Sequence, residues 1–193
     1  MVNPEHLARV IGSPVKLVLC GLDFAGKTAL VYRWKTGKFN PNLSPTLSPT
    51  LESVSIRGGL VAANVFDLGG QKKLRNQWRD YLEKSNAVIF VIDAHDRERY
   101  LEMKDEFKNR VLPELGEKPC LVVCNKLDLI YKQNQEKPIN ELIVEVEEII
   151  QNLLQLSIKK EKLGQFDVVA TSMVNGLGLK KITQFLRLRL TSS

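Results

Sequence analysis

GLDFAGKT, at Gly21–Thr28, follows an apolar run and precedes a segment with helical spacing. It fits the phosphate-loop pattern G-x-x-x-x-G-K-[ST], whose glycines let the backbone curl until its amides and the helix N-terminus point at phosphate oxygens. In this pattern the Lys27 ammonium neutralises the β- and γ-phosphates, and the Thr28 hydroxyl ligates magnesium. The segment therefore predicts a phosphate-binding loop, a feature that kinases, motor ATPases and switch proteins share.

Strand-like and helix-like segments alternate along the chain. Apolar, β-branched runs predict six strands, at Val15–Cys20, Ser53–Ile56, Leu60–Phe66, Ala87–Asp93, Cys120–Asn125 and Phe166–Thr171. Helical spacing predicts five flanking helices, at Lys27–Lys35, Gln71–Lys84, Arg97–Leu112, Ile139–Leu156 and Leu179–Leu190. This alternation is typical of an α/β protein whose mostly parallel sheet is covered on both faces.

The chain departs from this alternation in two places. Arg57-Gly58-Gly59 supplies two glycines for the positive φ angles of a tight hairpin, which predicts one antiparallel strand at the sheet edge. Tyr131–Pro138 is polar and contains proline, so we expect a surface loop there. We see no domain boundary within residues 14–193.

The composition is that of one globular domain. Of the 193 residues, 44% are hydrophobic and 26% are charged. No apolar run approaches the roughly 18 residues that span a bilayer, and the chain start lacks the pattern of a secretion signal, so we expect a cytoplasmic protein. Without a basic array interleaved with aromatic residues, the formal charge of +6 does not indicate nucleic-acid binding. Cys20, Cys120 and Cys124 lie in predicted strands and are expected to be reduced core thiols.

A second motif selects the base. Asn125-Lys126-Leu127-Asp128 follows a predicted strand and matches N-K-x-D. The Asp128 carboxylate can accept hydrogen bonds from the N1–H and the exocyclic amine of guanine, whereas adenine offers neither in that arrangement. Because an unpaired buried carboxylate costs kilocalories, Asp128 is expected to discriminate between the bases by orders of magnitude. The two motifs together predict a guanine-nucleotide site.

A third motif predicts hydrolysis. Asp67-Leu68-Gly69-Gly70-Gln71 matches D-x-x-G-Q at the end of the second hairpin strand. We expect Asp67 to hold magnesium through water and the Gly70 amide to reach the γ-phosphate. Gln71, the expected catalytic residue, can orient the attacking water.

With these three motifs in this order, the chain resembles the small GTPases, and it looks most like the Arf/Sar family over nearly its whole length. The distinctive parts are GLD at Gly21–Asp23 and FDLGGQ at Phe66–Gln71. PTLSPTLE at Pro45–Glu52 is similar to the Sar-type first switch, whereas Gln71 is Arf-like. The resemblance implies a P-loop NTPase G domain, with Trp78 and Tyr81 either facing effectors or packing in the core.

The resemblance also implies further site residues. The switch threonine of this family caps magnesium, and the duplicated S-P-T-L sequence offers Thr46 and Thr50, of which Thr46 has the family spacing to Glu52. A backbone amide in Thr171-Ser172-Met173 is expected to meet the guanine carbonyl. The predicted metal ligands are Thr28, Thr46 and Asp67. The predicted nucleotide-binding residues are Asp23, Phe24, Ala25, Gly26, Lys27, Thr28, Ala29, Thr46, Gly70, Asn125, Lys126, Asp128, Ser172 and Met173.

The switch is expected to be slow and regulated. Asp23 stands where many small GTPases have glycine, beside the expected γ-phosphate, and no arginine is obviously placed to act on that phosphate. We therefore expect slow GTP hydrolysis with magnesium, accelerated by an arginine from a GTPase-activating protein, which is typically worth about 10³ to 10⁵ in rate. An exchange factor and effectors are the other partners that the resemblance implies for this expected monomer, in regulation of the membrane-trafficking type.

Residues 1–13 are expected to form a short amphipathic helix. Asn3 can cap it, and Leu7, Val10 and Ile11 share a face. Such a helix either binds an anionic membrane surface in the GTP state or packs on the G domain. Two other functions stay open: a nucleotide-dependent scaffold with negligible hydrolysis, and a metabolite kinase, against which N-K-x-D argues.

Overall fold

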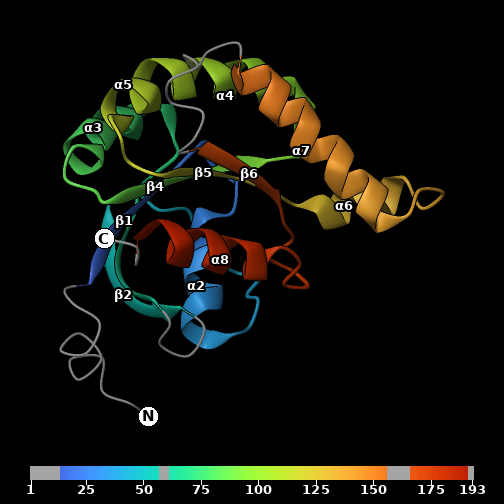
Figure 1. The fold of residues 1–193 in the computed structure, drawn as a ribbon, viewed down its shortest axis with the longest axis horizontal. Coiled ribbons are helices and arrows are strands. Elements are labelled where there is room, and N and C mark those ends of the chain that lie inside the picture. Colours follow the sequence, from blue (N-terminus) through green and yellow to red (C-terminus); the bar gives the residue numbers. More distant parts are fainter. Residues whose placement is uncertain (1–13, 57–60, 156–165, 191–193) are drawn as a thin grey trace.

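A six-stranded sheet in the order β2-β3-β1-β4-β5-β6 forms the centre of the computed structural model, which describes residues 14–56, 61–155 and 166–190 (Figure 1). The strands are β1 (Val15–Cys20), β2 (Thr50–Ile56), β3 (Val61–Asp67), β4 (Ala87–Asp93), β5 (Cys120–Asn125) and β6 (Phe166–Ala170). β2 pairs antiparallel with β3, and every other pairing in this sheet is parallel. The predicted mostly parallel sheet with one antiparallel edge strand is confirmed.

Helices cover both faces of the sheet, as predicted. They are α2 (Lys27–Thr36), α3 (Trp78–Leu82), α4 (Tyr100–Glu106), α5 (Leu112–Leu115), α6 (Leu127–Gln133), α7 (Ile139–Gln155) and α8 (Leu179–Leu190). α2 and α8 lie on one face, and α3, α4, α5 and α7 lie on the other (Figure 1).

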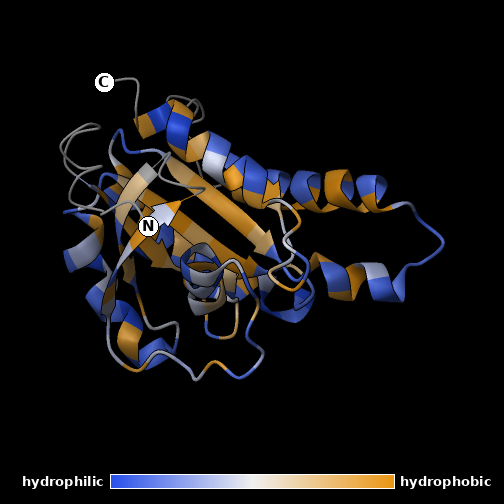
Figure 2. Cartoon of the chain, turned by 90° about the horizontal axis from the view of Figure 1, so that it is seen from below, coloured by the Kyte–Doolittle hydropathy of each residue, from blue (hydrophilic) through white to orange (hydrophobic). Residues whose placement is uncertain are grey.

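The apolar pattern of the sequence explains this layering. Strands β4 and β5 are apolar along nearly their whole length and are buried on both faces, as central parallel strands must be. On α7, the residues that pack into the core recur every four positions: Leu142, Val146, Ile150 and Leu154. Figure 2 shows the apolar strands enclosed between helices with polar outer surfaces. The three cysteines are buried and unpaired with one another, as expected.

Two predicted helices are less regular than expected. The predicted helix at Gln71–Lys84 begins as a 3₁₀ turn at Lys72–Gln77 and becomes α-helical only in α3. The predicted helix at Arg97–Leu112 opens with a 3₁₀ turn and contains a π-helical turn at Phe107–Val111 between α4 and α5. Pro113 follows this turn, and its missing N–H cannot continue an α-helical hydrogen-bond ladder.

Other boundaries also differ from the prediction. β2 begins at Thr50 rather than Ser53, because its ladder with β3 extends to the pair Thr50 and Asp67. α6 was missed, and the predicted surface loop from Tyr131 was wrong in its first three residues, which belong to that helix. The short, charged last turn of α6 resembles a loop in sequence. The predicted hairpin turn at 57–59 and the predicted helix within 1–13 lie outside the described residues.

Candidate functional site

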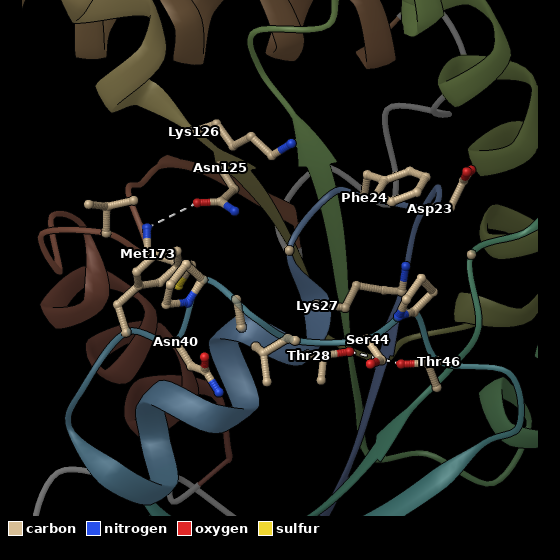
Figure 3. A pocket seen from close by; sticks show the side chains of 18 of the residues that line it. Asp23, Phe24, Lys27, Thr28, Asn40, Ser44, Thr46, Asn125, Lys126 and Met173 are labelled. Atoms are coloured by element: carbon tan, nitrogen blue, oxygen red, sulfur yellow. Dashed lines mark hydrogen bonds between the residues drawn. The ribbon is translucent and has the colours of Figure 1, made fainter.

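A cavity of about 370 Å³ lies at the carboxyl ends of the parallel strands, where α/β sheets usually bind ligands. The three predicted motifs and the segment between α2 and β2 meet there (Figure 3). Thirteen predicted site residues line the cavity: Asp23, Phe24, Gly26, Lys27, Thr28, Ala29, Thr46, Gly70, Gln71, Asn125, Lys126, Asp128 and Met173. Ala25 and Ser172 lie just behind this lining and are buried.

Two glycines allow the loop after β1 to take its shape. Gly21 has φ +133°, and a Cβ there would stand 2.0 Å from the Val91 carbonyl oxygen. Gly26 has φ +97°, and its Cβ would stand 2.2 Å from Asn125 Nδ2. Side chains are rare at such φ angles and these distances exclude any Cβ, so the motif needs glycine at both positions.

Lys27 is the buried cation of this loop, with 6% of its surface exposed. Its Nζ donates to the carbonyl oxygens of Gly21 and Leu22, at 3.0 and 2.8 Å. Burial lowers the pKa of Lys27 to about 8, and the nearby Asp67 carboxylate partly opposes this shift. A buried ammonium of this kind is stabilised by a further anion, which a phosphate group would provide.

Oxygen atoms from three segments meet beside Lys27. Thr46 Oγ1 lies 2.8 Å from Thr28 Oγ1 (Figure 3). Thr28 Oγ1 also donates to Asp67 Oδ2 at 2.6 Å, and Thr46 Oγ1 lies 3.3 Å from the same oxygen. Asp67 is 2% exposed, and its Oδ1 is buried without a hydrogen-bond partner among the described residues. Burial raises the pKa of Asp67, whereas the hydrogen bond from Thr28 lowers it. Hard oxygen donors with one unpaired carboxylate oxygen fit magnesium.

The structure brings Thr46, and not Thr50, to this oxygen cluster. Thr50 is the first residue of β2, where its side chain is exposed, while its backbone lies opposite Asp67 in the ladder. The spacing to Glu52 in the sequence had favoured Thr46 as well.

Asn125 connects the phosphate loop to the two loops expected to hold the base. It is 3% exposed, and its Nδ2 donates to the Ala25 carbonyl at 2.9 Å. Its Oδ1 accepts the Met173 amide at 3.1 Å (Figure 3). The Asp128 carboxylate accepts the Ser172 hydroxyl at 2.6 Å and lines the cavity. These bonds join the three loops into one assembly.

Asp23 lines the cavity, and its carboxylate has arginine partners that the sequence did not indicate. Its carboxylate accepts a hydrogen bond from Arg99 at 2.7 Å, and its side chain points away from the pair formed by Thr28 and Thr46 (Figure 3). The sequence did not indicate three further charged residues at the site. Arg75 and Arg99 contact Asp23, and Asp93 pairs with Lys126 at 2.7 Å. No motif in a single sequence marks which arginine will be buried against the phosphate loop.

Comparison with protein-family models identifies the family of this chain. The model of the ADP-ribosylation factor family matches residues 6–189 of the chain. The chain belongs to the ADP-ribosylation factor family. It is similar to ADP-ribosylation factor J of Dictyostelium discoideum, with 38% identity over 128 residues, which are 66% of each protein.

Solved structures agree with this assignment. The Arl6 (BBS3) small GTPase from Trypanosoma brucei, solved with the bound nucleotide analogue GppNp, matches with a TM-score of 0.64 and 26% identity. The match covers 92% of this chain and 99% of that one. The predicted resemblance to Arf-type small GTPases is therefore confirmed, and with it the P-loop GTPase fold.

In this ADP-ribosylation factor family chain, Trp78 is a core residue. It is 1% exposed, its Nε1 donates to the Gly69 carbonyl at 3.0 Å, and its ring packs edge-on against Phe90. Tyr81 is partly buried against Phe66. Of the two predicted roles for Trp78, the structure supports core packing.

Proposed function

We propose that this protein is a molecular switch that binds GDP and GTP with magnesium and hydrolyses GTP slowly. Whether the protein binds effectors then depends on whether the γ-phosphate is present. Family membership supports nucleotide binding in general. The observation that carries the full proposal is the oxygen cluster of Thr28, Thr46 and Asp67 beside the buried Lys27, because magnesium and a polyphosphate together satisfy both groups.

The base is selected at the opposite end of the cavity. Asp128 accepts the N1–H and the exocyclic amine of guanine, while Ser172 holds the carboxylate from behind. The Met173 amide, which Asn125 already fixes, lies in the loop that contacts the base carbonyl. We also retain Asn125 and Lys126 as nucleotide-binding residues, as the sequence predicted.

Thr28, Thr46 and Asp67 would hold magnesium, which would supply positive charge against the phosphates of the bound nucleotide. Lys27 remains protonated against the phosphates. Gln71 orients the attacking water, and the Gly70 amide donates to the γ-phosphate. Thr46 belongs to the segment before β2, and we propose that this segment is a switch in which the γ-phosphate stabilises the position of Thr46 in the cluster.

Slow hydrolysis follows because no arginine among the described residues lines the cavity. Arg75 and Arg99, which both contact Asp23 in the phosphate loop, are held by carboxylates. We propose that a GTPase-activating protein supplies the missing cation, and that an exchange factor and effectors complete the cycle of a monomeric switch.

We place this cycle in the cytoplasm, in regulation of the membrane-trafficking type, with attachment to anionic membranes in the GTP state. Family membership supports this setting. Among the described residues, no helix has both the length and the apolar character needed to cross a membrane. Liposome flotation with GDP or with a non-hydrolysable GTP analogue tests the attachment, which should appear only with the analogue.

Binding and single-turnover assays test the proposal directly. Purified protein should bind GDP and a GTP analogue at least about 10³-fold more tightly than ADP or ATP, and only with magnesium at full affinity. Phosphate should appear slowly from bound GTP and faster with an activating protein. Nucleotide binding without any phosphate release would instead favour a nucleotide-dependent scaffold.

A further inference from the structure

Arg75 is a buried cation between the phosphate loop and the turn after β3. Only 1% of its side chain is exposed. Its Nε donates to the Gly70 carbonyl at 2.7 Å, and its Nη2 lies 3.5 Å from Asp23 Oδ1. Through Nη1 it also reaches the α4 carboxylates of Glu102 and Glu106, at 2.8 and 3.1 Å. One side chain thus contacts three segments.

The charges around Arg75 are balanced within one cluster. Arg99 Nη2 donates to Asp23 at 2.7 Å and its Nε donates to Glu102 at 2.9 Å, while Arg110 pairs with Glu106. Three guanidinium groups therefore face three carboxylates. Arg75 and Arg99 neutralise the Asp23 carboxylate, so it does not present an unscreened negative charge to the expected γ-phosphate position.

The turn after β3 lies directly on the phosphate loop. A Cβ on Gly70 would stand 2.3 Å from the Asp23 amide nitrogen and 2.4 Å from the Leu22 carbonyl carbon. The preceding carbonyl, of Gly69, is held by Trp78 at 3.0 Å. Trp78 therefore holds the peptide that contains the Gly70 N–H, and Arg75 holds the next peptide through the Gly70 carbonyl, so Gly70 is fixed between the loop and these two side chains.

We propose that Arg75 is a positioning residue for the γ-phosphate, which holds Gly70 against the phosphate loop, and that Asp23 anchors Arg75 from the loop side. The inference rests on the proposed function, in which the Gly70 amide donates to the γ-phosphate. The sequence linked Asp23 to slow hydrolysis, and in this proposal its carboxylate also supports GTP binding.

The physical reason is preorganisation. A donor that is already fixed before the ligand arrives loses less freedom on binding, so its hydrogen bond contributes more. GDP has no γ-phosphate and gains nothing from a fixed Gly70 amide. The contribution of Arg75 and Asp23 is therefore confined to the difference between GTP and GDP.

The test is the ratio of the dissociation constants for GDP and a non-hydrolysable GTP analogue, measured with magnesium. Arg75→Lys keeps the charge but loses the fork, and Asp23→Asn removes the anchor. We expect each to lower the preference for the analogue about tenfold, the loss of roughly one charge-assisted hydrogen bond, with GDP affinity within threefold of the original. Arg79→Gln is the matched control, because Arg79 is 70% exposed and pairs only with Glu83 and Glu114 among the described residues.

The outcomes separate the two proposals. A protein that binds no guanine nucleotide contradicts the proposed function itself. Normal nucleotide binding with an unchanged affinity ratio in Arg75→Lys and Asp23→Asn overturns the positioning role alone. Tighter binding of the analogue by Asp23→Asn also overturns it, because that result would mean that the Asp23 carboxylate repels the γ-phosphate. If Arg75→Lys does not fold, Asp23→Asn, at a side chain that is 26% exposed, decides in its place.

Discussion

Replacing Asp128 with asparagine should change which base the protein binds. In the proposed complex, the carboxylate accepts two hydrogen bonds from guanine, and each such bond to a charged acceptor contributes about 1.5 to 3 kcal/mol. An asparagine oxygen can still accept the N1–H, but its amide meets the exocyclic amine donor to donor. The loss of one to two bonds predicts roughly 10- to 10⁴-fold weaker GDP binding.

The same substitution should favour xanthine. Xanthine has a carbonyl where guanine has the exocyclic amine, so the asparagine amide can donate to it while its oxygen accepts the N1–H. Ser172, whose hydroxyl lies 2.6 Å from Asp128 Oδ1, can donate to the asparagine oxygen as well. Equilibrium titration with fluorescent GDP and XDP measures both effects.

A nearby carboxylate provides the control. Asp93 pairs with Lys126 at 2.7 Å but does not line the cavity, so Asp93→Asn should weaken both nucleotides equally and leave their ratio unchanged. An Asp128→Asn protein that keeps GDP affinity within threefold and shows no gain for XDP would refute the assignment of Asp128 to the base.

Four further perturbations follow from the structure. Gln71→Leu should lower single-turnover GTP hydrolysis at least about 10²-fold with unchanged nucleotide affinity, since only water orientation is lost, and an unchanged rate would remove Gln71 from the mechanism. Chelation of magnesium should speed GDP release, and Asp67→Asn should blunt that response in a stopped-flow assay; a full response in the variant would argue against Asp67 as a ligand. Gly26→Ala should lower the free energy of unfolding by about 1 to 3 kcal/mol or abolish nucleotide binding, because Gly26 has a φ of +97° and a Cβ there would stand 2.2 Å from Asn125. An unchanged melting temperature together with unchanged nucleotide affinity would contradict this. Hydrogen bonding from Arg99 lowers the pKa of Glu102 to about 2, so the stability that Glu102 contributes is present above its usual pKa and is lost as pH falls from about 4.5 toward 2. Because the Glu102 side chain is 38% exposed, this contribution to the free energy of unfolding amounts to about 1 kcal/mol. Urea unfolding at several pH values measures it, and Glu102→Gln should lose the pH dependence.

Patterns that depend on neighbours in sequence predicted most of the fold. The central strands were found within a residue of their ends, because buried parallel strands are continuous apolar runs. α6 escaped because it is short and begins inside the N-K-x-D motif. The π-helical turn at Phe107–Val111 escaped because the apolar spacing continues through it, and only its hydrogen bonds differ.

The candidate site divides in the same way. Motif residues such as Lys27, Asp67 and Asn125 were predicted because their spacing carries the chemistry, and the structure brings them to one cavity. Arg75 and Arg99 were not, since their roles depend on contacts with Asp23 across more than fifty residues of chain. Charged residues in a helical segment look alike in sequence whether they face solvent or another loop.

Asn125 has a mechanical consequence for the release of nucleotide. Its single amide group touches the Ala25 carbonyl in the phosphate loop and the Met173 amide in the base loop. The phosphate-binding end and the base-binding end of the site are thus mechanically coupled through Asn125. A partner that pulls only the phosphate end open would strain the base end through this side chain, so it need not touch the base to eject the whole nucleotide.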